Sequence, residues 1–186
     1  MSIIQTDRLT LRPLTMQDAP EVYARWTHDP QVAQYCRWAP HPNVETTKAW
    51  MAQLQAAADG GFDYRWGIEL RADHTLIGMI DAVALSADGK TATIGYVLAR
   101  NYWNHGYVTE ALRAVIDRLF ADGVQVVQAE HNVNNPASGR VMEKCGMVFT
   151  HFSKSQVKFD SDALCDVKWY EIRNPSEPGE QEGDRA

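Results

Sequence analysis

The spacing of hydrophobic residues changes along this chain and predicts where its helices and strands lie. In residues 6–14 hydrophobic and polar positions alternate, which is typical of a strand. Residues 16–28 and 44–58 instead carry hydrophobic residues at helical spacing. Between these helices, residues 31–43 are irregular and rich in aromatic side chains. They form either a lid over a binding pocket or ordinary packing against the core.

The pattern then becomes a meander of strands. Three strands are predicted over residues 62–70, 75–85 and 91–98, and their short connections imply antiparallel pairing. The elements expected after them are a long helix to Phe120, a strand over 124–129, a helix over 135–145, and strands near 148–159 and 163–172. This order predicts a mixed α+β fold, with one mostly antiparallel sheet of about seven strands flanked by about four helices.

Length and composition fit one domain. The chain has 186 residues, of which 45% are hydrophobic, and we assign residues 1–173 to a single folded unit. Residues 174–186 are acidic and contain no hydrophobic residue able to dock, so we expect a disordered tail there. The tail carries half of the formal net charge of −6. The remaining body is only mildly acidic, which disfavours a nucleic-acid-binding protein.

Several protein classes are disfavoured by what the sequence lacks. No hydrophobic run is long enough to cross a bilayer and no secretory signal opens the chain, so we expect a cytoplasmic protein without a membrane partner. The three cysteines and six histidines show no metal-ligand spacing, so neither a disulfide framework nor a metal site is expected. The glycine-rich fingerprints of dinucleotide and nucleoside-triphosphate sites are missing.

The most informative stretch runs from Ile94 to Phe120. It reads as a strand, a polar turn around Gly106 and a helix. Backbone N–H groups at the start of a helix have no intrahelical acceptor, and the helix dipole is positive there. Gly106 would let the backbone approach a phosphate closely, so the junction is a candidate anion site. Many such junctions bind nothing, so this turn alone leaves the function open.

A second stretch, residues 132–147, follows the next predicted strand. It places Asn135, Ser138 and Arg140 at the start of a helix. The Tyr-Trp-x-x-Gly-Tyr-x-Thr-Glu-Ala-Leu turn and the Asn-x-x-Ser-x-Arg-Val-x-Glu-Lys-x-Gly helix together resemble the GCN5-related N-acetyltransferase (GNAT) family. Within it they look like the Rim-type branch, which acetylates the N-termini of ribosomal proteins. The resemblance covers residues 6 to about 172.

The resemblance implies acetyl-CoA as the acetyl donor. The cofactor contacts it implies are backbone N–H groups around the pyrophosphate, at Asn104, His105, Gly106, Tyr107, Val108 and Thr109, and positions along the pantetheine arm, at Val97, Leu98 and Asn135. Asn104 and Val108 replace the smaller residues common in the family. Asparagine tolerates a left-handed backbone, whereas Val108 is expected in a helical first turn. Asn135 could also, or instead, cap the following helix.

The catalytic groups are less clearly marked. Ser138 looks like the serine that the ribosomal-protein branch places near the sulfur, although it could also be an ordinary helix hydroxyl. The tyrosine that protonates the thiolate in much of the family is replaced here by Met142. A carboxylate common on the strand before the turn is replaced by Thr93, which leaves Asp81 and Glu110 as candidate bases. Glu110 could instead support the turn through the helix dipole.

These motifs predict an acetyl-CoA-dependent N-acetyltransferase in which a primary amine attacks the thioester directly, in a ternary complex. The acceptor would be a protein N-terminus or a small amine, because similar motifs serve both. The lack of a clear base favours a weakly basic amine such as an α-amine. The alternative is a non-catalytic acyl-CoA-binding or regulatory domain of the same fold, suggested by Met142 and Thr93. We expect a monomer or a homodimer.

Overall fold

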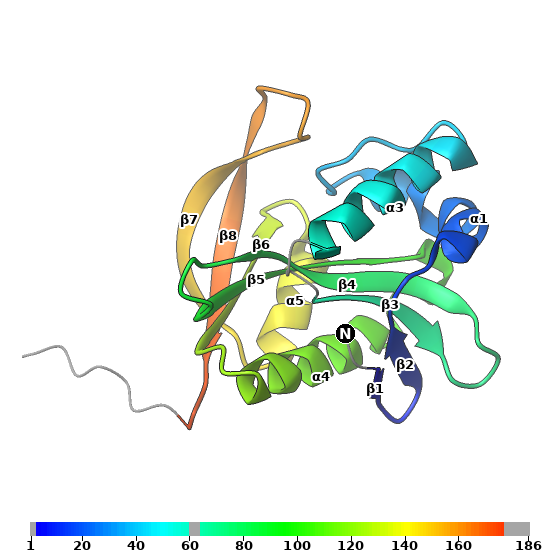
Figure 1. Cartoon of the computed structure of the whole chain (residues 1–186). Coiled ribbons are helices and arrows are strands. Elements are labelled where there is room, and N and C mark those ends of the chain that lie inside the picture. The colour runs from blue at the N-terminus through cyan, green and yellow to red at the C-terminus, as the bar shows by residue number, and fades with distance from the viewer. Residues whose placement is uncertain (1–2, 60–63, 177–186) are drawn as a thin grey trace, which may run out of the picture.

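The computed structural model describes residues 3–59 and 64–176, which form one β-sheet with helices on both faces (Figure 1). Helices α1 and α3 lie on one face, and α4 and α5 lie on the other. A long hairpin of two strands, β7 and β8, extends past the sheet on the side away from the N-terminus. The mixed α+β fold predicted from the hydrophobic pattern is confirmed.

The sheet has eight strands within the described residues. They are β1 (Ile4–Gln5), β2 (Leu9–Arg12), β3 (Arg65–Leu70), β4 (Leu76–Leu85), β5 (Thr91–Leu98), β6 (Val126–Asn132), β7 (Val148–Gln156) and β8 (Leu164–Arg173). Their order across the sheet is β1-β2-β3-β4-β5-β6-β8-β7. The pair β5 and β6 is parallel and every other neighbouring pair is antiparallel. Each predicted strand is present, and the two-residue strand β1 is an addition at the edge.

The helices follow the predicted order with two differences, a divided first helix and the additional short helix α2. They are α1 (Ala19–Val22), α2 (Pro30–Ala33), α3 (Val44–Asp59), α4 (Tyr107–Ala121) and α5 (Pro136–Lys144), with the short turns η1 (Met16–Asp18), η2 (Tyr23–Thr27) and η3 (Arg100–Tyr102). The single helix expected over residues 16–28 is divided into η1, α1 and η2. Pro20, which has no backbone N–H to donate, lies in the first turn of α1. Asn43 caps α3 by accepting a hydrogen bond from the Thr46 N–H at 2.9 Å.

Two hydrophobic clusters fill the space between the sheet and its helices. The larger lies on the side of α4 and α5 and includes Leu112 and Leu119, both fully buried. The smaller lies on the side of α1 and α3 and includes Trp26, Met51 and Met79. Burial of these apolar side chains is the main favourable term for the fold. It also fixes the positions of α4 and α5 against the strands that precede them.

The strands β5 and β6 separate toward their carboxyl ends. They pair only where Thr91–Thr93 lies beside Val126–Gln128. Beyond that point β5 remains paired with β4 up to Leu98, and β6 remains paired with β8 up to Asn132. Parallel strands end at the same edge of a sheet, so the turn into α4 and the turn into α5 meet where the two strands have moved apart. This separation creates the candidate site.

The described residues extend slightly past the predicted end of the domain at residue 173. Asn174 was assigned to the tail, yet its backbone N–H donates to the Gln125 oxygen at 2.8 Å, so the folded chain includes it. Residues 177–186 of the predicted tail, and residues 62–63 of the predicted strand 62–70, lie outside the described residues. Among the helices of residues 3–59 and 64–176, none has the length and apolar character needed to cross a membrane.

Candidate active site

The gap between β5 and β6 exposes backbone groups of β5. Because the Ala99 N–H donates to the Ile77 oxygen on β4 at 2.8 Å, and backbone directions alternate along a strand, Tyr96 and Leu98 direct their N–H groups away from β4. They therefore face the gap, which β6 has left. The Leu98 oxygen already accepts a bond from Trp103 Nε1 at 2.8 Å. The edge of β5 thus presents backbone N–H groups that can pair with an extended ligand.

The turn before α4 presents a second set of backbone donors. Asn104 and Gly106 have φ angles of 64° and 79°, in the left-handed region, and α4 begins at Tyr107. The expectation that Val108 lies in a helical first turn is met, and Asn104 has the left-handed backbone that asparagine tolerates. Within the described chain, no hydrogen bond leaves the N–H groups of residues 104–109. Six consecutive unbonded donors at the positive end of a helix dipole make this turn a candidate anion site.

A contact with the segment between β1 and β2 holds this turn in place. Glu110, in the first turn of α4, accepts hydrogen bonds from the Thr6 hydroxyl at 2.5 Å, the Arg8 N–H at 2.9 Å and Arg8 Nε at 2.7 Å. Arg8 Nη1 also donates to the His105 oxygen at 3.0 Å, inside the turn itself. Partial burial alone would raise the pKa of Glu110, but the bonds from Thr6 and Arg8 outweigh it and lower that pKa. Glu110 is therefore an anion that supports the turn.

The first turn of α5 forms the other side of the gap. Asn135 occupies the N-cap position and Pro136 the first helical position, but the Asn135 side chain makes no capping hydrogen bond. That amide is left available to a ligand. Ser138 lies within this first turn, and its hydroxyl is 2.9 Å from the phenol oxygen of Tyr96 on β5. Sequence reasoning missed Tyr96, because alternation along β5 predicts its face but not its partner on α5.

Asp81 lies on the opposite face of the sheet from Ser138, on the side of α3. It is directly across from Gly95 of β5 and is 9% exposed. Burial raises its pKa to about 6, although Arg65, whose Nε lies 3.3 Å from the carboxylate, opposes the shift. Arg65 also donates to the Leu54 oxygen of α3 at 2.6 Å, which fixes the pair. A carboxyl group with this pKa can exchange a proton near neutral pH.

A second carboxylate, Glu130 on β6, was not predicted. Val127 and Ala129 of this strand point into the core under α4, so Glu130 points to the same face as Asp81. It is bonded to Arg37 from the segment after α2, and to the Ser155 hydroxyl of β7 at 2.8 Å. The alternation in residues 126–132 could have identified its face. No pattern in the sequence identifies Arg37 as its partner.

The candidate catalytic residues therefore occupy three places. Ser138 lies at the gap on the side of α5, Asp81 lies on the α3 face, and Glu110 lies behind the turn, where Thr6 and Arg8 occupy its oxygens.

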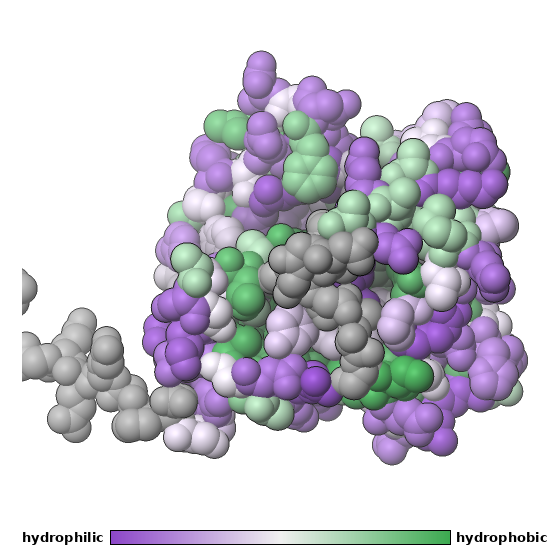
Figure 2. Space-filling view, in the orientation of Figure 1, coloured by the Kyte–Doolittle hydropathy of each residue, from purple (hydrophilic) through white to green (hydrophobic). Residues whose placement is uncertain are grey.

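Figure 2 shows the side of the molecule that carries α3 and the β7–β8 hairpin. Hydrophobic residues appear in several separate places in this view, among hydrophilic residues.

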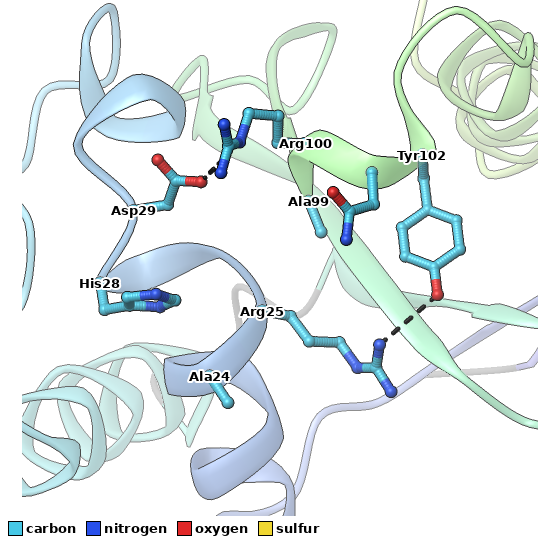
Figure 3. A pocket seen from close by; sticks show the side chains of 8 residues that line it. Ala24, Arg25, His28, Asp29, Ala99, Arg100 and Tyr102 are labelled. Carbon is cyan, nitrogen blue, oxygen red and sulfur yellow. Dashed lines mark hydrogen bonds and ion pairs between the residues drawn. The ribbon is translucent and has the colours of Figure 1, made fainter.

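A pocket of about 270 Å³ adjoins the segment that leads into the turn (Figure 3). Its lining comes from η2 and η3 and the residues beside them. An ion pair joins Arg100 to Asp29 at 3.0 Å across the pocket, and a hydrogen bond joins Arg25 to the Tyr102 hydroxyl at 3.4 Å. Both arginines already have partners, so the pocket offers a ligand little uncompensated charge. Its contacts brace η3 against η2 and so support the start of the turn.

Comparison with known proteins adds a family assignment to this geometry. A family model described as "Acetyltransferase (GNAT) domain" matches residues 8–148. The uncharacterised N-acetyltransferase YoaA of Bacillus subtilis (strain 168) is 31% identical over 180 residues, which cover 94% of this chain and 98% of that protein. The ribosomal-protein-serine acetyltransferase of Escherichia coli (strain K12) is 32% identical over 96 residues, 51% of this chain and 53% of that protein.

The fold is also found among solved structures. The microcin C7 self-immunity acetyltransferase MccE, in complex with acetyl-CoA and AMP, has a TM-score of 0.81 and 19% sequence identity. The match covers 90% of this chain and 93% of that one. At this identity the likeness supports the fold.

The role of Gly106 in ligand binding can be tested by comparing it with Gly123, a second glycine with a left-handed backbone. Gly106 at the start of α4 and Gly123 just after its end have φ angles of 79° and 94°, and an added Cβ would meet no atom closer than 3.6 Å at either. Valine is strained by roughly 1–2 kcal/mol in this conformation, so both substitutions destabilise the fold. We expect G106V also to displace the donors of the turn and weaken acetyl-CoA binding about ten-fold or more in calorimetric titration.

The variant G123V is the control, because it carries the same kind of strain at the far end of the same helix. It should bind acetyl-CoA as the unmodified protein does. Equal affinity in G106V and the unmodified protein, or equal losses in both variants, would contradict the assignment of the turn as the anion site.

Proposed function

The chain belongs to the acetyltransferase (GNAT) family, and we propose that it moves an acetyl group from acetyl-CoA to a primary amine by direct attack within a ternary complex. The observation that carries the proposal is the row of unbonded N–H groups at residues 104–109, next to the unpaired edge of β5. A pyrophosphate and an extended amide-containing arm are what such a pair of surfaces would bind.

The cofactor would lie along the gap. Its pyrophosphate would accept hydrogen bonds from the N–H groups of the turn, and Gly106 would allow its close approach. The pantetheine arm would take the place beside β5 that a strand would otherwise occupy, running past Val97 and Leu98. Asn135 would donate to or accept from the arm, since its side chain makes no capping bond. Acetyl-CoA would supply the activated acetyl group.

The same edge would also activate the thioester. The Tyr96 and Leu98 N–H groups facing the gap are fixed in direction by the pairing of β5 with β4. One of them would donate to the thioester oxygen, where negative charge develops as the amine attacks. A fixed backbone donor needs no reorganisation during the reaction. Ser138, at the start of α5, would lie toward the sulfur and donate a hydrogen bond as the thiolate leaves.

Asp81 is the base that we propose for the amine. Its pKa of about 6 leaves it mostly ionised at neutral pH, yet basic enough to accept a proton. It lies on the face opposite Ser138, so a base and a thiolate donor would flank the gap from its two sides. Glu110 is assigned to support of the turn, since Thr6 and Arg8 already bond both its oxygens.

Two acceptor classes are candidates, a protein N-terminus and a small amine. The motifs of the turn and of α5 resemble the ribosomal-protein branch, and the Escherichia coli relative named for that activity matches about half of this chain. We therefore propose an α-amine as the first choice. An α-amine with a pKa near 8 needs less help from a base than a lysine does. A cytoplasmic location stays a prediction of the sequence.

A turnover assay with a defined panel of amines tests the function. Release of CoA from acetyl-CoA would be followed with peptides beginning with Ser or Ala, the same peptides with a blocked N-terminus, and spermidine. We expect turnover with at least one free amine and none with the blocked peptides. Acetyl-CoA binding without turnover by any amine would support the non-catalytic alternative, and absence of binding would contradict both.

The pH dependence of the rate tests Asp81. With an N-terminal peptide, kcat/KM should rise with pH through two steps, one near 6 from Asp81 and one near 8 from the amine. Both groups act in their deprotonated forms, so activity falls as pH falls. We expect Asp81→Asn to lower kcat/KM by about 10²-fold and to remove the step near 6 only.

Asp166→Asn is the matched control, because Asp166 is exposed and pairs with Lys154 on the hairpin. It should leave both steps unchanged. A D81N variant that keeps the step near pH 6 would show that another group accepts the proton.

A further inference from the structure

The phenol of Tyr96 connects strand β5 to helix α5, on the α5 side of the gap between β5 and β6. Its oxygen lies 2.9 Å from Ser138 Oγ and 3.0 Å from the backbone oxygen of Ser138. Both contacts go to one residue, and that residue is the serine assigned to the leaving sulfur. Tyr96 therefore sets both the position of Ser138 relative to β5 and the direction of its hydroxyl.

We propose that Tyr96 is a positioning residue for acetyl transfer, which holds the Ser138 hydroxyl as a hydrogen-bond donor to the departing sulfur. The inference rests on the proposed function and adds a residue to it.

The two contacts determine where the hydroxyl protons lie. A backbone oxygen can only accept, so the contact between Tyr96 and the Ser138 oxygen uses the single proton of the phenol. The contact between the two hydroxyls must then use the Ser138 proton, which points to the Tyr96 oxygen. The Ser138 side chain is thus held in one orientation before any cofactor binds, with its free lone pair directed elsewhere.

The same pair can respond when the sulfur leaves. As the amine nitrogen bonds to the acetyl carbon and the C–S bond breaks, the electron pair goes to sulfur and the amine proton goes to the base. Ser138 then turns its O–H toward the thiolate, and Tyr96 turns its own O–H from the Ser138 oxygen to Ser138 Oγ. Each oxygen keeps its proton, and a chain of hydrogen bonds polarises toward the new charge. The thiolate takes its proton from solvent afterwards.

The surroundings of Tyr96 suit this role. Burial raises the pKa of its phenol far above the ordinary value, so the group stays neutral and keeps its proton. Met142, which stands where much of the family has a tyrosine, is 1% exposed and has no proton to give. The phenol of Tyr96 comes instead from β5, and it reaches the sulfur through Ser138 rather than directly.

A double-mutant cycle tests the inference. We expect Tyr96→Phe to lower kcat about ten-fold and to leave KM for acetyl-CoA within about two-fold, because the lost interaction acts only as the sulfur departs. Ser138→Ala should lower kcat by a similar factor. The variant carrying both changes should be no slower than S138A alone, since Tyr96 acts through Ser138. The amine that turns over fastest in the panel serves as acceptor.

Tyr170→Phe controls for simple loosening of α5. Tyr170 is a buried tyrosine under this helix, and its hydroxyl donates to Glu143 of α5 at 3.1 Å. Removing that bond loosens α5 without touching Ser138, so kcat in Y170F should remain within about two-fold of the unmodified protein.

Three results would overturn the inference. Multiplying losses in the double variant, a rise in KM in place of a fall in kcat in Y96F, or an equal fall in Y170F would each show that Tyr96 only packs. If the unmodified protein turns over and one of these results is found, the inference about Tyr96 is wrong but the proposed function is still supported. Absence of turnover with every amine removes the proposed function and this inference together.

Discussion

The separation of β5 from β6 after Thr93 is the constraint on which the site depends. A strand that loses its neighbour leaves backbone N–H and C=O groups unpaired, and buried groups of this kind require a partner. The sheet tolerates the loss because each strand keeps its other neighbour, β4 for β5 and β8 for β6. The gap is therefore held rigidly, and an extended ligand can pair with β5 as a strand would.

The rest of the site is arranged around that gap by contacts between distant parts of the chain. The segment between β1 and β2 fixes the turn before α4, through the ion pair of Arg8 with Glu110. The phenol of Tyr96 fixes the first turn of α5. The ion pair of Asp81 with Arg65 fixes a carboxylate on the other face. Each group is thus carried by a packed element, which is how a protein holds reacting groups in place without reorganisation.

Much of this could be predicted from the sequence, for physical reasons that differ between elements. Alternation and helical spacing identified the strands and the long helices, because those periods follow directly from backbone geometry. The helix expected over residues 16–28 was predicted as one piece because its hydrophobic spacing continues through η1, α1 and η2. The turn was identified because Gly106 and the helix that follows it are local features.

The partners of side chains were beyond prediction. Alternation assigns Tyr96 and Glu130 to faces of the sheet, but their partners Ser138 and Arg37 lie on other elements, 42 and 93 residues away. The pKa of Asp81 depends on burial under α3, which no local pattern contains. Asn174 was assigned to the tail because it is polar, and no local pattern contains the hydrogen bond from its backbone N–H to the Gln125 oxygen. This site differs from an ordinary strand–turn–helix junction mainly in its long-range side-chain contacts, and less in its helices and strands.

The central claim is that the turn and the edge of β5 bind acetyl-CoA through their backbone N–H groups. Residue-resolved amide hydrogen exchange, measured with and without saturating acetyl-CoA, tests it most directly. The account predicts slower exchange at residues 104–109 and at Leu98 when the cofactor is present, with little change near Gly123. Unchanged exchange at the turn in a saturated complex would contradict it.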